Sequence, residues 1–136
     1  MKKVICAAAI LASAGVAHAA SSTNVVAATL DGSSVVSGGD PDGSGSFTLR
    51  IDAGDGGFCY DLNINGVRNV GAAHIHEGAE GLPGRPVLDL VAGSHCSNTD
   101  AQALNDIVDN PSNYYIDVLS SDYPEGAVRG QLARAN

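Results

Sequence analysis

Two histidines one residue apart, His74 and His76, have a spacing that suits a shared metal ion. On a β-strand, residues i and i+2 point to the same face, roughly 6–7 Å apart, so two imidazoles there can converge on one ion. Imidazole nitrogens bind Cu(II), Zn(II) and Ni(II) well. The pair leaves two interpretations open. The first, which a pair without an established third ligand favours, is two polar residues of a strand edge or of a contact surface. The alternative is a transition-metal site, with copper as the preferred cofactor.

A metal site of this kind needs a third ligand, and the sequence offers several. His95 supplies another imidazole, whereas Glu77 and Glu80 supply carboxylate oxygens close to the pair. The predicted site is therefore the pair together with either His95 or a carboxylate. A superoxide dismutase is excluded, because its copper and zinc sites need more histidines than this chain contains.

Arg129 lies in the alternating run GAVRGQL (126–132) and has two interpretations. The first is an internal ion pair that fixes strand register, with Asp89, Asp117 or Glu125 as the partner. The second is a guanidinium that binds a carboxylate ligand in a bidentate manner. The sequence alone leaves both open and favours the ion pair.

Other catalytic chemistry is not indicated. The sequence contains no Gly-x-Ser-x-Gly elbow, no P-loop and no dinucleotide fingerprint. A dyad of His76 and Glu77 is unfavourable, because adjacent residues on a strand face opposite sides. Asp40 and Asp42, in GGDPDGSG, are expected to form a turn rather than a calcium site. We therefore expect the protein not to be an enzyme.

The N-terminal residues have the pattern of a secretory signal peptide. Lys2 and Lys3 precede an apolar run over residues 4–16, and Ala17-His18-Ala19 is a small-x-small cleavage signal. The apolar run is shorter than the roughly 20 residues of a membrane span. We therefore predict a signal peptide over residues 1–19, a single domain over residues 20–136, and a location in the periplasm or outside the cell.

The predicted mature chain is strongly acidic. Loss of both lysines leaves five arginines against 15 acidic residues, a formal net charge of −10. This charge disfavours nucleic acid and anionic membranes, which carry the same sign. Partners are therefore expected to be a protein or a small ligand, and the protein is expected to be a monomer.

Two cysteines remain after the predicted cleavage, Cys59 and Cys96. Cysteines of exported proteins usually pair, because the compartment is oxidising. The sequence therefore predicts one disulfide between them.

Short apolar and polar alternations, separated by turn residues, predict an all-β fold. Seven such runs are typical of an antiparallel sandwich or barrel. One segment, 99–109, instead has the helical spacing of Leu104, Ile107 and Val108, with Pro111 after it. The predicted strands are residues 24–30, 44–52, 57–66, 68–76, 86–93, 113–120 and 126–133.

Two longer motifs together resemble the CHRD domain, a module first described in chordin. They are AAHIHEGAEGLPGRPVLDL (72–90) and NPSNYYIDVLSSDYPEGAVRGQL (110–132). The resemblance implies an immunoglobulin-like or superoxide-dismutase-like β-sandwich and carries no general catalytic assignment. One position departs from the family pattern, because relatives commonly have histidine where this chain has Leu119. The residues that fit the family's C-terminal pattern are Pro124, Gly126, Arg129, Gly130, Gln131 and Leu132.

These observations lead to two functional hypotheses. The first is an exported, non-enzymatic binding module that presents the histidine pair and the Gly- and Pro-rich segment 77–86. The second is a periplasmic metal-binding protein that uses the same pair. The candidate contact residues beside the pair are Glu77, Glu80, Arg85 and Arg129.

Overall fold

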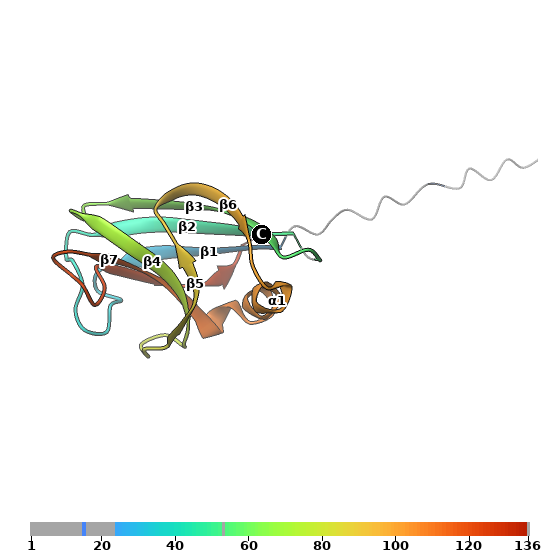
Figure 1. Ribbon diagram of the computed structural model, residues 1–136. Coiled ribbons are helices and arrows are strands. Elements are labelled where there is room, and N and C mark those ends of the chain that lie inside the picture. The colour runs from blue at the N-terminus through green and yellow to red at the C-terminus, as the bar shows by residue number, and fades with distance from the viewer. Residues whose placement is uncertain (1–14, 16–23, 53, 136) are drawn as a thin grey trace, which may run out of the picture.

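The computed structural model describes residue 15, residues 24–52 and residues 54–135. Within this part of the chain, nine antiparallel strands form one sheet that curls into a half-barrel (Figure 1). The strands are β1 (Asn24–Asp31), β2 (Ser44–Ile51), β3 (Gly57–Asn65), β4 (Val70–Glu77), β5 (Arg85–Leu90), β6 (Gly93–Asn98), β7 (Tyr114–Ser120), β8 (Val128–Gln131) and β9 (Ala133–Arg134).

Strand order explains why the sheet curls. The order is β5-β4-β7-β8-β1-β2-β3-β6, with β9 also paired to β1. β5 and β6 are therefore the two edges of the sheet, yet only Val91 and Ala92 separate them in the chain. Such a short connection spans at most about 10 Å, so the two edges must approach each other there. The Val91 N–H donates to the Tyr60 hydroxyl of β3 (3.1 Å), which holds this connection against the sheet.

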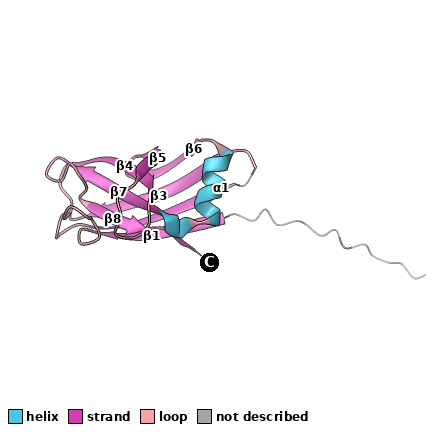
Figure 2. Ribbon diagram, turned by 90° about the horizontal axis from the view of Figure 1, so that it is seen from below, coloured by secondary structure: helices cyan, strands magenta, loops and turns pink. Residues whose placement is uncertain are grey.

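The hydrophobic core lies on the inner face of the curled sheet. Phe47, Leu49 and Ile51 of β2 are at most 1 % exposed, and the residues between them face outward, as the alternation predicts. The helix α1 (Ala101–Asp109) covers one end of the sheet with the predicted residues Leu104, Ile107 and Val108 (Figure 2).

Residues next to α1 determine where the helix begins and ends. The Asp100 side chain caps the helix by accepting a hydrogen bond from the Gln102 N–H (3.1 Å). Pro111 starts a short 3₁₀ turn, Pro111–Asn113, that leads into β7. The predicted all-β fold and the predicted helix are therefore both confirmed.

β6 is the element that strand periodicity did not predict. Its sequence, GSHCSN, has no apolar alternation, because it is an edge strand whose residues are mostly exposed. The predicted strand 86–93 ends at Leu90 instead, and Gly93, with φ of 107°, begins β6. The predicted strand 126–133 is divided into β8 and the two-residue strand β9, so the described sheet has nine strands rather than seven.

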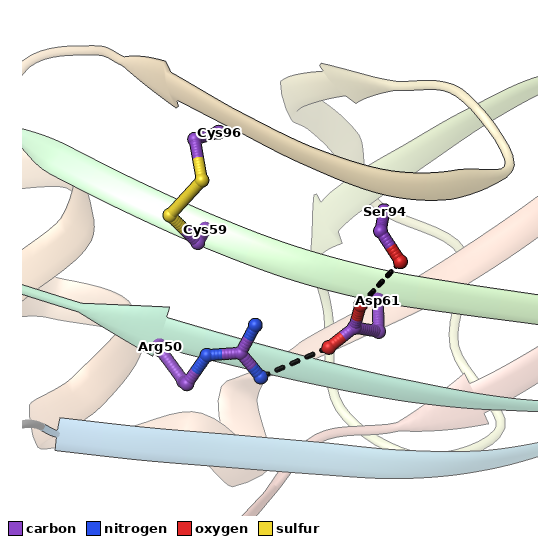
Figure 3. Close-up of a disulfide and its surroundings, with 5 residues drawn as sticks. All are labelled: Arg50, Cys59, Asp61, Ser94 and Cys96. Carbon is purple, nitrogen blue, oxygen red and sulfur yellow. Dashed lines mark hydrogen bonds and ion pairs between the residues drawn. A yellow bond between two sulfur atoms is a disulfide. The ribbon is translucent and has the colours of Figure 1, made fainter.

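The predicted disulfide is present and fastens β6 to the sheet. Cys59 and Cys96 are directly opposite each other in the β3–β6 pair (Figure 3). Two residues along, the Ser94 hydroxyl and the Arg50 guanidinium both donate to the Asp61 carboxylate. These hydrogen bonds lower the pKa of Asp61, and the one from Ser94 has the larger effect. Covalent and polar contacts thus hold an edge strand that has little apolar surface to bury.

The predicted signal peptide, residues 1–19, lies outside the described residues except for Gly15, so it stays a prediction. In the part of the chain that the structure covers, no helix is both long and apolar enough to cross a membrane.

Replacement of both cysteines, Cys59→Ala/Cys96→Ala, should lower the free energy of unfolding by about 3–4 kcal/mol. The bridge joins residues 37 positions apart, and its loss restores that loop's entropy to the unfolded chain. Urea unfolding at neutral pH measures the change. An unchanged unfolding midpoint, or two titratable thiols in the native parent, would contradict the role assigned to this bridge.

Candidate metal centre

The histidine pair lies on the outer face of β4. Ala73 and Ile75 of this strand are buried in the core, at 1 % and 0 % exposed, so His74 and His76 point the opposite way. The register of β4 with β7 places Asp117 directly opposite His74. The sheet therefore brings one carboxylate to the two imidazoles from a strand that lies about 40 residues later.

The three side chains converge closely enough to bind one ion. Oδ1 of Asp117 is 3.5 Å from Nδ1 of His74 and 3.0 Å from Nε2 of His76. The candidate ligand atoms of the three residues all lie within 4.8 Å of one another. Ligands bound at 2.0–2.1 Å around a tetrahedral ion are about 3.3 Å apart. The cluster thus needs only small side-chain adjustments to hold a first-row metal ion.

A second contact orients the His76 ring. Its Nδ1 lies 3.0 Å from the carbonyl oxygen of Gly84. A carbonyl can only accept, so Nδ1 carries the proton and Nε2 faces Asp117 (3.0 Å). Histidines that bind metals commonly donate their other ring N–H to such a carbonyl. His76 already makes an outer hydrogen bond of this kind, with Nε2 left facing the cluster.

The same contacts change the pKa of His76. Burial is the largest single influence and lowers it, but the hydrogen bond and charge of Asp117 and the carbonyl of Gly84 together outweigh burial. The net result is a pKa raised above the ordinary 6.5. When His76 is protonated, both of its ring nitrogens therefore have an acceptor in reach, the Gly84 carbonyl and the Asp117 carboxylate.

An aromatic ring and a guanidinium lie beside His76. The Tyr115 ring is parallel to the His76 ring, with an interplanar angle of 2° and centroids 4.8 Å apart. The Arg129 guanidinium carbon lies 3.5 Å from the centroid of the same tyrosine ring. Arg129 is only 5 % exposed. The outer face of the sheet thus contains a buried stack next to the histidine pair.

The predicted ion pair of Arg129 is wrong. Its guanidinium donates to the carbonyls of Leu82 (2.8 Å) and Ala79 (3.0 Å), and the described residues include no carboxylate within ion-pair distance of it. Asp117 faces Arg129 across the β7–β8 pair, but its carboxylate is turned toward the histidines of β4. Asp89 lies farther away, on β5 at the edge of the sheet.

The structure separates the other predicted ligands from the pair. His95 lies on β6, where its ring is 5.7 Å from that of Tyr60 and its Nε2 is 3.1 Å from the Ala92 carbonyl. Glu77 forms an ion pair with Arg85 (2.8 Å) where β4 and β5 meet the loop. Glu80 is exposed on that loop and helps to line a shallow pocket with Arg129 and Gln131.

Asp117 is the candidate ligand that sequence reasoning missed, because the sequence suggested it only as a partner of Arg129. Alternation in YYIDVLS does place it on the outer face with Tyr115, between the buried Ile116 and Val118. Leu119, where relatives commonly have histidine, follows Asp117 on that face and is half-buried. The cluster in this chain is therefore two imidazoles and one carboxylate.

Comparison with known proteins adds one finding. The family model of the CHRD domain matches residues 26–132, which include every strand from β1 to β8 in whole or in part. Neither the curated proteins nor the solved structures gave a match.

In metal-free protein, the NMR titration midpoint of His76 should lie above 6.5, and Asp117→Asn should lower it. Because the folded-state pKa is raised, the stabilisation from His76 is complete below the unfolded pKa and is lost as the pH rises through the folded pKa. Urea unfolding in the presence of a chelator should therefore show this loss in the parent and not in Asp117→Asn. A parent midpoint below 6.5 would contradict the assigned role of Asp117.

Proposed function

Because this chain belongs to the CHRD domain family, we propose that it is a non-enzymatic binding module whose ligand is a transition-metal ion, with copper preferred. The observation that carries the proposal is the convergence of His74, His76 and Asp117 on one point of the outer face. Their side chains are 14–23 % exposed, so the cluster is reachable from solvent and yet held by its surroundings.

The ligand types support copper in its oxidised state. Two imidazoles and a carboxylate form a nitrogen and oxygen set, which suits Cu(II) and Zn(II) rather than a thiolate-seeking ion such as Cu(I). Cys59 and Cys96 supply no thiolate, because they form the disulfide. Cu(II) exceeds Zn(II) in the usual order of affinities for such sites. Three protein ligands also leave a coordination position for water or another small ligand.

Nearby charge supports a cationic ligand. Asp89, on β5, has a carboxylate oxygen 3.8 Å from Nε2 of His74, on the side of the ring away from Asp117. The chain as a whole has a formal net charge of −8. Negative potential of this kind raises the local concentration of cations.

The loop beside the cluster supports a second candidate, a contact surface for a protein partner. Leu82, in the segment between β4 and β5, is 58 % exposed. The histidine rings themselves support this candidate poorly, since they are partly buried and their nitrogens face the carboxylates of Asp89 and Asp117 and the Gly84 carbonyl. Leu82→Ser should abolish capture of such a partner and leave metal binding unchanged, which distinguishes the two candidates.

Export is part of the same proposal. The disulfide suits an oxidising compartment, and we place the protein in the periplasm or outside the cell. N-terminal sequencing of protein recovered from those fractions tests it, with a start at residue 20 as the expected result.

Calorimetric titration of the disulfide-intact protein with Cu(II) should give a Kd below about 1 μM, with weaker binding of Zn(II). His74→Ala, His76→Ala and Asp117→Ala should each reduce the affinity strongly, because each removes one of three ligands. His95→Ala is the matched control and should bind as the parent does, because His95 contacts Tyr60 and the Ala92 carbonyl and is not one of the three converging residues.

Binding no tighter than a Kd of about 10⁻⁴ M in the folded parent would overturn the metal proposal. Equal loss of affinity in His95→Ala and His76→Ala would also overturn it, because the ion would then not be held by the β4–β7 cluster.

A further inference from the structure

The loop between β4 and β5, residues 78–84, is held by side chains of β7 and β8. Arg129 donates to the carbonyls of Ala79 and Leu82, and the Gln131 amide donates to the carbonyl of Gly78 (2.9 Å). At the other end of the loop, the Gly84 N–H donates to the Tyr115 hydroxyl (3.0 Å). Side chains from two neighbouring strands therefore fix the backbone of a loop that is rich in glycine.

Gly84 connects this loop to the candidate metal ligand. Its N–H is held by Tyr115, and its carbonyl accepts from Nδ1 of His76. A Cβ at position 84 would lie 1.6 Å from the carbonyl oxygen of Glu77, so no larger residue fits without moving the loop. The close approach that glycine allows is what puts this carbonyl within reach of the histidine ring.

Stacking on Tyr115 also restrains the His76 ring. Tyr115 lies parallel to it at 4.8 Å, and the Arg129 guanidinium lies 3.5 Å from the centroid of the tyrosine ring. A guanidinium over an aromatic face is attractive, and more so when it is shielded from water, as Arg129 is. Rotation of the His76 ring would break this parallel contact as well as the hydrogen bond to Gly84.

We infer that Tyr115 and Arg129 are positioning residues of the proposed metal site: they hold the Gly84 carbonyl and the His76 ring so that Nε2, and not Nδ1, binds the ion. This inference rests on the proposed function and deepens it. Neither residue is a ligand itself, because Tyr115 is engaged by Gly84 and Arg129 is a cation. Outer partners of this kind typically contribute about 10–100-fold to metal affinity.

The test compares Cu(II) affinity and the electron paramagnetic resonance spectrum across matched variants. Tyr115→Leu removes the ring and the hydroxyl, and Arg129→Met removes both carbonyl contacts. Each should weaken Cu(II) binding by about 10–100-fold and change the nitrogen hyperfine pattern of the bound ion. Tyr115→Phe keeps the stacked ring and loses only the hydrogen bond to Gly84, so it should weaken Cu(II) binding less than Tyr115→Leu does.

Arg134→Met is the matched control. Arg134 also donates to a backbone carbonyl, that of Val108 (2.8 Å), but it lies on β9 away from the histidines. Its loss should leave both affinity and spectrum unchanged. Arg129→Lys provides a milder substitution if Arg129→Met does not fold, since it keeps the charge and loses the planar contact with Tyr115.

A metal-free measurement separates this inference from the proposed function. In acidic buffer, where His76 is protonated, its Nδ1–H should give a slowly exchanging downfield NMR signal in the parent and lose it in Tyr115→Leu. If the parent shows this signal but does not bind copper, the proposed function is wrong, whereas the positioning of the His76 ring by Tyr115 is still supported. Absence of the signal in the parent, or an unchanged affinity and spectrum in folded Tyr115→Leu and Arg129→Met, overturns the inference.

Discussion

The outer face of this domain depends on the guanidinium of Arg129. A buried cation would normally be paired with a carboxylate, but here two loop carbonyls and the face of Tyr115 take that place. The loop that it holds is rich in glycine and has few side chains with which to anchor itself. Arg129 therefore joins two segments that are far apart in the chain, the histidine strand with its loop and the C-terminal strands, into one unit.

Asp117 makes that unit suitable for a cation. Its carboxylate faces both imidazoles and is only 14 % exposed, so a positive charge beside it is favourable. A protonated His76 would supply that charge, and so would an ion bound at the proposed site. Binding of an ion there would displace the proton of a protonated His76, because a histidine ligand has to be neutral at the coordinating nitrogen. A proton and the proposed ion would therefore compete for the same place between β4 and β7.

The sheet keeps its hydrophobic core and the candidate metal site on opposite faces. The inner face carries the core residues of every long strand and is closed at one end by α1 (Figure 2). The outer face carries the histidines, Asp117 and the Tyr115–Arg129 stack without interrupting that core. The disulfide joins β3 to β6, and neither cysteine is one of the three residues that converge on the outer face of β4 and β7.

Local patterns in the sequence were sufficient for the strands with a buried face, for α1, for the cysteine pair and for the shared orientation of His74 and His76. These features follow from side-chain alternation, helical spacing and compartment chemistry, which act over a few residues or on composition. β6 was missed because an edge strand held by a disulfide needs no apolar alternation. The contacts of Arg129 with the loop after β4, and the place of Asp117 beside the histidines, depend on how β4, β7 and β8 pair. These contacts join residues 41 to 50 positions apart, and only tertiary packing selects one register among many.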